Sequence, residues 1–348
     1  CRYHRSSFEH AHSDWRRTLA EADVDCDRTE VARAHIERWI EPMTDKWTIH
    51  DAPDHTGRTV VVTGSNTGIG YETALALAGL GAHVVLAVRD EARGRSAVTR
   101  SREKYPTASM SVQRLDLSSL ASIRAAADEI ASNHPRVDVL VDNAGIAHSP
   151  RSLTEDGFER IFGTNHLGHF AYTGLLLPVL LDTPGSRIVT VSALAHRQVT
   201  GIDFDNLRRR RPDENDDYDE WTVYGESKLA NLLFTRELNT RLAGTDTIAV
   251  AAHPGLARSD LSRNASGRER ALFRALAPLL QSTAAGAAPS CRAATDPTLR
   301  GGEYLGPRWR RIRGAPVVEE PSAAARNDDD AQRLWSMSEA LTDVKFSV

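Results

Sequence analysis

The chain has 348 residues, of which 41% are hydrophobic and 26% are charged. These fractions are typical of a globular protein with a sizeable core and exclude a disordered or fibrous chain. The net charge of −4 implies no general nucleic-acid-binding surface, and the longest apolar stretch, residues 175–181, is far shorter than the ~20 residues that span a bilayer.

The three cysteines, Cys1, Cys26 and Cys291, are too few and too scattered for a disulfide framework or a zinc site. The N-terminal residues contain no apolar run typical of a secretory signal. We therefore expect a protein of the reducing cytoplasm that holds no metal.

Residues 1–42 differ from the rest of the chain, because they are rich in charge and contain no predicted strand. Two interpretations remain open. These residues are either an over-extended reading frame upstream of a natural start at Met43, or a genuine N-terminal arm. Residues 43–56 lead into the first regular element.

From residue 57 onward, short apolar runs alternate with segments of helical pattern. The predicted strands cover residues 58–63, 83–88, 110–115, 137–141, 187–192 and 247–252, and the predicted helices cover residues 68–80, 90–105, 118–133, about 154–181 and 221–243. Strands with little polar alternation, separated by helices, indicate an α/β fold with a parallel sheet covered on both faces.

The first predicted strand runs into a glycine-rich turn, TGSNTGIG, at residues 63–70. Gly64 permits a tight turn, Gly68 lets the backbone approach a pyrophosphate, and Gly70 allows close helix–strand packing. The helix that follows directs its first N–H groups toward such an anion. The spacing GxxxGxG differs from the GxGxxG of other dinucleotide folds, and on this motif alone a plain strand–helix turn remains the alternative.

Five further motifs follow in the order DNAG (142–145), TNHLGHF (164–170), VTVSA (189–193), YGESK (224–228) and HPG (253–255). With the glycine-rich turn, they resemble the short-chain dehydrogenase/reductase family over residues 57–306, and most closely its retinol dehydrogenase and WW-domain oxidoreductase branch. The resemblance implies a single Rossmann-fold domain over residues 57–310, with a doubly wound parallel sheet and a C-terminal extension at 311–348. It also implies an NAD(P)-dependent oxidoreductase that interconverts an alcohol and a carbonyl compound.

The resemblance further implies which residues bind the cofactor. They are Gly64, Ser65, Asn66, Thr67, Gly68, Ile69 and Gly70 in the turn, Asp116 and Leu117 at the adenine, Asn143, Ala144 and Gly145, Tyr224 and Lys228, and Pro254, Gly255 and Ser259. Ser259 is the residue expected to hold the carboxamide. Asp142 stands where the family often has Asn.

Arg89 follows the second strand, at the place where this fold meets the adenosine ribose. A guanidinium suits a 2′-phosphate in charge and geometry, whereas an acidic residue there binds a 2′-hydroxyl. We therefore favour NADP(H), with NAD(H) as the open alternative. Asp90 counts against this preference unless it only caps the next helix.

Tyr224 and Lys228 are four residues apart in a predicted helix, so their side chains share one face. A phenol with a pKa near ~10 is a poor base at neutral pH, but an adjacent ammonium and an oxidised nicotinamide favour the phenolate. Tyr224 is the predicted acid/base. Ser192 is expected to bond the substrate oxygen, and by resemblance Asn165 helps hold a water that links Lys228 to solvent.

A regulatory protein that binds NADP(H) without turnover is the alternative function class, although such proteins typically lack the Tyr or the Lys. A relative of light-dependent protochlorophyllide reductase is a second alternative, weakened because no Cys lies between residues 26 and 291. His166, His169 and His253 invite a metal hypothesis. No carboxylate or Cys stands in register with them, so packing and helix-end hydrogen bonds are the better account.

Two poorly patterned segments, 196–220 and 256–281, are expected to recognise a hydrophobic alcohol, aldehyde or ketone. Within the second segment, an apolar run at 271–280 fits a pocket roof, ordinary core or the face of a homo-oligomer equally well.

Overall fold

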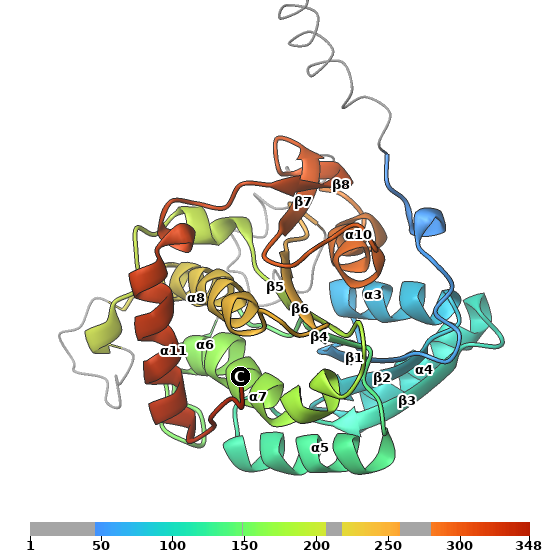
Figure 1. Cartoon of the computed structure of the whole chain (residues 1–348), viewed down its shortest axis with the longest axis horizontal. Helices are drawn as coiled ribbons and strands as arrows, with labels where there is room; N and C mark the ends of the chain where they lie inside the picture. The colour runs from blue at the N-terminus through green and yellow to red at the C-terminus, as the bar shows by residue number, and fades with distance from the viewer. Residues whose placement is uncertain (1–45, 148, 207–217, 258–279) are drawn as a thin grey trace, which may run out of the picture. The chain divides into compact units, whose positions relative to one another are not determined.

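The computed structural model describes residues 46–147, 149–206, 218–257 and 280–348. Residues Trp47–Val348 form one compact unit, in which helices lie on both faces of a central sheet (Figure 1). The predicted α/β fold with a doubly wound, mostly parallel sheet is confirmed.

The sheet has eight strands in the order β3-β2-β1-β4-β5-β6-β7-β8. All neighbouring strands pair in parallel except β7 and β8, which are antiparallel. The strands are β1 Thr59–Thr63, β2 His83–Val88, β3 Ser109–Arg114, β4 Val139–Asp142, β5 Arg187–Val191, β6 Ile248–Ala252, β7 Tyr304–Trp309 and β8 Arg313–Glu319. The strand order reverses between β1 and β4, and such a reversal opens a ligand crevice at the carboxyl ends of the strands.

The helices fall into two layers. They are α3 Gly68–Gly79, α4 Glu91–Lys104, α5 Leu120–Asn133, the single turn α6 Arg160–Phe162, the π-helical turn η3 Gly163–Leu167, α7 Gly168–Leu181, α8 Glu220–Arg241, α10 Thr283–Thr295 and α11 Asp328–Thr342, with short 3-10 turns η2 Ile49–Asp51, η4 Leu194–Arg197, η5 Phe204–Asn206 and η7 Ala324–Arg326. Helices α3, α4 and α10 cover one face of the sheet, and α5, α7 and α8 cover the other. Helix α11 packs on α8 and α7.

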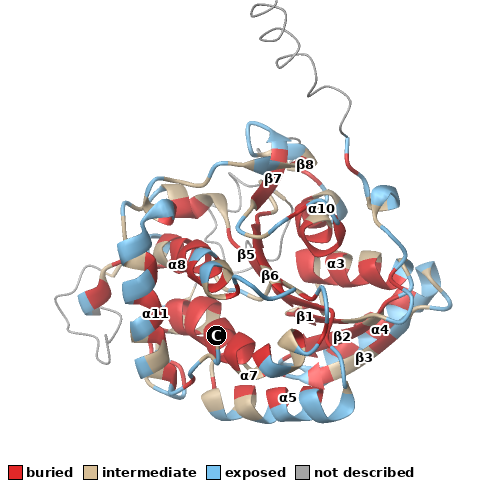
Figure 2. Ribbon diagram, viewed as in Figure 1, coloured by how far each residue is buried: buried red, intermediate tan, exposed pale blue. Residues whose placement is uncertain are grey.

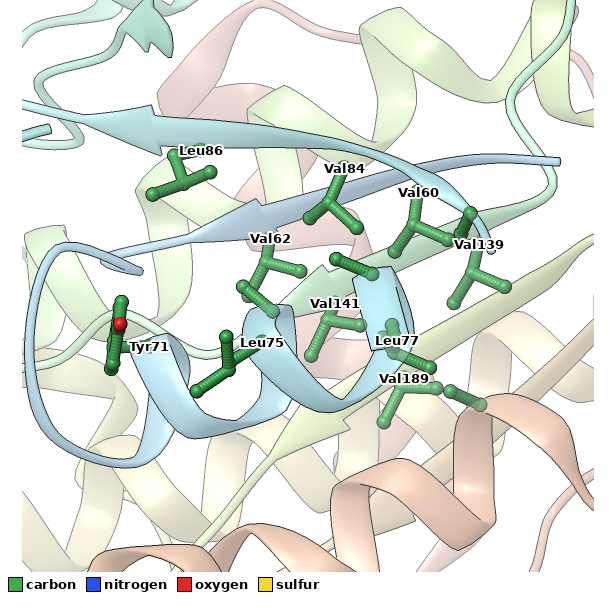
Figure 3. Packing of buried hydrophobic residues seen from close by; sticks show 14 of the residues in the cluster. Val60, Val62, Tyr71, Leu75, Leu77, Val84, Leu86, Val139, Val141 and Val189 are labelled. Carbon is green, nitrogen blue, oxygen red and sulfur yellow. The ribbon is translucent and has the colours of Figure 1, made fainter. Parts of the chain in front are cut away.

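The central strands are buried on both faces (Figure 2). Val60 and Val62 point toward Leu75 and Leu77 of α3 (Figure 3), whereas Val61 between them packs on the α5 and α7 side. This two-sided burial is why the strand sequences read as continuous apolar runs rather than as alternating ones. Among the described residues, no helix is both long and apolar enough to cross a bilayer.

Strands β7 and β8 lie outside the sequence prediction. Each contains a proline, and Pro307 and Pro316 face each other across the pair. Proline in an apolar run argues against a strand, but it is tolerated at the edge of a sheet, which is where this pair lies. The helix predicted from residue 154 begins only at Arg160, because Leu153 and Glu159 first form an antiparallel bridge.

The boundary expected at residue 310 has no counterpart in the structure. Strand β8 completes the sheet and α11 packs on α8, so residues 311–348 belong to the compact unit. The buried Trp335 of α11 lies with its ring centroid 4.4 Å from that of Phe346 and 5.9 Å from that of Phe234 on α8. At the other end, Trp47 packs with Ile69 and Cys291, so part of the lead-in segment is also core.

Replacing Trp335 by Ala should therefore lower the free energy of unfolding by about 3 kcal/mol or more, the usual cost of deleting a buried aromatic side chain. Trp309→Ala is the matched control, because Trp309 is 52% exposed and its loss should cost within ~0.5 kcal/mol. Urea unfolding of both variants measures the difference. Equal, small effects would show that α11 is not part of the cooperative unit.

Candidate active site

A cavity of about 470 Å³ opens at the carboxyl ends of the strands on either side of the β1–β4 reversal. The described site residues that line it are Gly64, Asn66, Thr67, Gly68, Ile69, Gly70, Arg89, Asp116, Leu117, Asn143, Ala144, Gly145, Ser192, Tyr224, Lys228, Pro254 and Gly255. These residues are far apart in the sequence, since the chain spans 192 positions from Gly64 to Gly255, both included. The fold brings them together around one cavity.

Of the predicted site residues that the structure describes, Ser65 and Asn165 do not line the cavity. Ser65 is fully buried and its hydroxyl donates to the Val62 carbonyl (2.7 Å), so it braces the turn from inside. Asn165 is fully buried behind the cavity wall. Ser259 falls outside the described residues, as do 207–217 and 258–279, the greater part of the second substrate segment and about half of the first.

The glycine-rich turn packs directly on the loop after β4. A Cβ added to Gly64, whose φ is +65°, would lie 2.9 Å from the Ala144 Cα, and one added to Gly70 would lie 2.3 Å from the Asn143 Nδ2. A Cβ on Gly68, whose φ is +62°, would meet nothing within 4 Å. The turn is therefore closed toward the protein and open at Gly68, where α3 begins, as a phosphate-binding helix N-terminus requires.

Thr63 links the glycine-rich turn to the loop after β4 by hydrogen bonds. Its hydroxyl oxygen accepts hydrogen bonds from the backbone N–H groups of Asn143 and Ala144 (both 2.9 Å), and its carbonyl accepts from the Asn143 Nδ2 (2.8 Å). Strands β1 and β4 are neighbours, so this contact fixes the two segments that border the cavity, the glycine-rich turn after β1 and the loop after β4.

Tyr224 and Lys228 lie on one face of α8, as their spacing predicts, with the Lys228 Nζ 5.9 Å from the centre of the Tyr224 ring. The Nζ donates to the Val191 carbonyl (3.0 Å). The Ser192 hydroxyl donates to the Lys228 carbonyl (2.7 Å). A substrate oxygen that takes the Ser192 proton therefore competes with this carbonyl.

Asn165 supports the pair from behind. Its amide accepts from the Ile146 N–H (2.8 Å) and donates both to the Ile146 carbonyl (2.9 Å) and to the Ser227 hydroxyl (3.0 Å). A Cβ on Gly145 would lie 3.2 Å from the Lys228 Nζ and 3.3 Å from the Asn165 Oδ1. Only glycine leaves the space between these two polar groups clear.

Burial shapes the ionisation of the pair. It raises the pKa of the Tyr224 phenol well above its ordinary value and lowers the pKa of the Lys228 ammonium to about 8. Desolvation disfavours the charged form of each group. Near neutral pH the protein by itself therefore presents a neutral phenol, ready to donate a proton, beside a lysine that is still mostly charged.

Two arginines reach the rim of the cavity, Arg89 just before the cap of α4 and Arg93 in the first turn of that helix. Both are exposed. Asp90 caps α4 by accepting from the Arg93 N–H (3.1 Å), and its carboxylate pairs with the Arg93 guanidinium at 3.3 Å. Arg93 does not stand out in the sequence, because Arg89 precedes the Asp90 cap of α4 and helical spacing does not relate the two arginines.

Among the described residues, no group of His, Cys, Asp and Glu side chains is arranged to hold a metal ion. His166 and His169 are buried in the helical segment that carries Asn165, and each makes hydrogen bonds to neighbouring protein groups.

The chain matches the family model for short chain dehydrogenase over residues 58–201. It is 41% identical to retinol dehydrogenase 12 of Mus musculus over 292 residues, which cover 83% of this chain and 88% of that protein. A crystal structure of an uncharacterized protein from Mycobacterium paratuberculosis is 39% identical, with a TM-score of 0.72 over 87% of this chain and all of that one. An active-site complex of Pseudomonas aeruginosa RhlG with NADP is 25% identical, with a TM-score of 0.58 over 72% of this chain and 94% of that one.

Asp142 is a buried acid at the end of β4, next to the cavity-lining Asn143. Its Oδ2 accepts from the Thr173 hydroxyl (2.8 Å), and its Oδ1 has no hydrogen-bond partner among the described residues. Burial raises the pKa of this carboxyl to about 7. A carboxyl whose pKa rises on folding holds its proton more tightly in the folded state, so it costs no stability below about pH 4 and the most above pH 7.

Asp142→Asn should thus leave stability nearly unchanged at pH 4.5 and raise it by about 2–4 kcal/mol at pH 8, since Asn needs no proton to be neutral. Asp138→Asn is the control: Asp138 accepts from the Thr59 N–H (2.8 Å) and pairs with Arg136, so its change should destabilise at both pH values. Urea unfolding at the two pH values checks this. A gain for Asp142→Asn that does not depend on pH would contradict the account.

Proposed function

Because the chain belongs to the short-chain dehydrogenase/reductase family and is related to the retinol dehydrogenases, we propose that it interconverts a hydrophobic alcohol and its carbonyl compound with NADP(H). The observation that carries the proposal is the convergence of Tyr224, Lys228 and Ser192 on the cavity that the glycine-rich turn borders. A cofactor-binding fold alone does not need a buried Tyr–Lys pair backed by an Asn.

The residues present fit a dinucleotide. Gly68 leaves open space at the N-terminus of α3, where the backbone N–H groups would hold a pyrophosphate. When bound, the nicotinamide supplies or accepts the hydride. The chain itself supplies the proton and the alignment of the reacting carbonyl.

In the reducing direction, the neutral phenol of Tyr224 donates its proton to the oxygen of the substrate carbonyl. The Lys228 ammonium, with a pKa of about 8, stabilises the phenolate that remains and shares in its reprotonation. The Ser192 hydroxyl turns from the Lys228 carbonyl to the substrate oxygen and orients it. The raised pKa of Tyr224 keeps the phenol protonated and so favours proton donation in the reducing direction. In the oxidising direction the phenolate has to form first, and the positive charges of Lys228 and of the oxidised nicotinamide offset the free-energy cost of forming it.

Preference for NADP(H) rests on Arg89 and Arg93 at the rim of the cavity, because two guanidinium groups suit a 2′-phosphate. Two acidic residues also line the cavity: Asp90 caps α4, and Asp116 accepts hydrogen bonds from the N–H and hydroxyl of Ser118. The NADP complex of RhlG supports the same choice. The substrate class rests on the name of the retinol dehydrogenase relatives, since retinol is a hydrophobic alcohol, and on the apolar lining at Ile146, Ala147 and Ala193.

Tyr224→Phe removes one hydroxyl and should lower turnover of retinaldehyde or another apolar aldehyde by ~10²–10⁴-fold, with NADPH affinity nearly unchanged. Tyr172→Phe is the control, because that hydroxyl is also buried and has no partner among the described residues. Lys228→Ala should lose both turnover and NADPH affinity, and the double variant should be no worse in turnover than the poorer single one. Normal turnover in Tyr224→Phe would favour the non-catalytic alternative.

Arg89→Ala should weaken NADPH binding by ~10–100-fold and NADH binding by less than ~3-fold, because only the 2′-phosphate loses a charged hydrogen-bond donor. Arg93→Ala should act in the same direction but less, since Asp90 already pairs with Arg93. Arg95→Ala on the same helix, whose guanidinium instead pairs with Glu91 at 3.7 Å, is the control. Fluorescence titration gives the dissociation constants, and equal losses for both cofactors would overturn the assignment.

A further inference from the structure

His169 lies between the cofactor loops and the segment that carries Asn165. Its side chain is 1% exposed. One ring nitrogen, Nε2, is 2.9 Å from the Thr63 hydroxyl at the end of β1, and the other, Nδ1, is 2.9 Å from the Asn165 carbonyl. The imidazole therefore bridges the end of β1 and the turn η3, which carries Asn165.

The partners fix the tautomer of the ring. A carbonyl oxygen only accepts, so Nδ1 carries the proton and donates to Asn165. In a neutral ring, Nε2 is then an acceptor, and the Thr63 hydroxyl donates to it. Burial lowers the pKa of His169 to about 4, which keeps the ring neutral in the ordinary working range.

The direction of this bond decides what Thr63 can do. Because its single proton goes to His169, its oxygen lone pairs face the N–H groups of Asn143 and Ala144, both of which line the cavity. The other acceptor near the hydroxyl, the Val141 carbonyl, is 3.4 Å away. His169 is thus the better acceptor of the two, and it aligns the hydroxyl that joins the glycine-rich turn to the loop after β4.

The other end of the bridge reaches the catalytic pair. Asn165 belongs to the π-helical turn η3, a distortion that is frequent at functional sites. Its side chain grips Ile146 and the Ser227 hydroxyl, which itself donates to the Tyr224 carbonyl (2.8 Å). A ring that fixes the Asn165 backbone therefore acts on the same helix turn that carries Tyr224.

We propose that His169 is a positioning residue that couples the cofactor-binding loops to the catalytic Asn165–Tyr224–Lys228 group through a Thr63–His169–Asn165 hydrogen-bond bridge. The predicted effect on cofactor affinity rests only on the shape of the loops. The predicted effect on turnover rests on the proposed oxidoreductase function.

His166 supplies a matched control in the same helical segment. It too is 1% exposed, and burial lowers its pKa to about 3. Its Nε2, however, bonds the Ser338 hydroxyl of α11 (2.9 Å), and its ring packs against Phe162, Phe170 and Phe234. Losing His166 therefore costs folding stability without touching either loop.

The test compares His169→Leu, His169→Gln and His166→Leu in the full chain. Leu keeps the bulk without polar atoms, whereas the Gln amide retains one donor and one acceptor. His169→Leu should weaken NADPH binding by roughly 3–15-fold, as expected for one or two hydrogen bonds, and lower kcat at saturating NADPH by about tenfold with KM for the aldehyde unchanged. His169→Gln should recover most of both losses, and His166→Leu should lower the melting temperature while leaving NADPH affinity and kcat near wild type.

Two further measurements do not depend on a substrate. The ¹⁵N shifts of the His169 ring, assigned by comparison with the Leu variant, should report a proton on Nδ1. On a Thr63→Val background, His169→Leu should cost no further NADPH affinity, because the bridge is already broken.

The proposal is overturned if the His169 proton sits on Nε2, if His169→Gln is no better than His169→Leu, or if His169→Leu and His166→Leu bind NADPH alike. If wild-type protein turns over no carbonyl compound, the proposed function fails, and the affinity and NMR results still decide whether the bridge exists.

Discussion

The contact between the loop after β1 and the loop after β4 is the constraint on which the site depends. The two strands are neighbours at the point where the sheet order reverses, so their loops must approach closely while the helices they lead to diverge. The approach is so close that Gly64 and Gly70 have no room for a side chain toward Ala144 and Asn143. The N-terminus of α3 and the loop after β4, as far as Gly145 beside Lys228, are positioned from this contact.

The second theme is the polar layer beneath the cavity. Lys228, Asn165, His169 and Asp142 are nearly or fully buried, and burying such groups costs free energy unless each finds a partner. Most are satisfied by backbone carbonyls and N–H groups, as Lys228 is by Val191. Asp142 is the exception, with one oxygen unpartnered, so it is neutral below about pH 7. The same desolvation keeps Tyr224 protonated near neutral pH and lowers the pKa of Lys228 to about 8, at which the lysine is still mostly charged at pH 7. A neutral phenol beside an ammonium is the arrangement that the proposed proton donation to a carbonyl uses.

Much of this was predictable from local patterns. Most of the first six strands carry short apolar runs, and the glycine spacing with the Tyr–Lys pair indicates where a dinucleotide and a carbonyl would meet. Strands β7 and β8 were not predictable, because Pro307 and Pro316 break the run and only the partner strand makes that tolerable. Nor was the inward orientation of Ser65, since sequence position within a turn does not say which way a side chain faces. His169 looked like a packing residue because its partners, Thr63 and the Asn165 carbonyl, are brought to it by the fold.

The backbone of the β7–β8 hairpin contacts the loop after β6, in which Gly255 lines the cavity. A Cβ on Gly255 would lie 2.3 Å from the Ile312 carbonyl, and the same carbonyl accepts from the Leu256 N–H at 2.8 Å. The same Cβ on Gly255 would also lie 2.6 Å from the Pro307 Cγ, and Gly314 at the start of β8 has a φ of +108°, which L side chains rarely adopt. Pro307, Gly314 and the number of residues between the strands are therefore constrained. Homologous proteins that keep this turn are thus expected to vary at the other exposed hairpin positions but to tolerate few insertions or deletions there, so the segment evolves by replacement rather than by change of length.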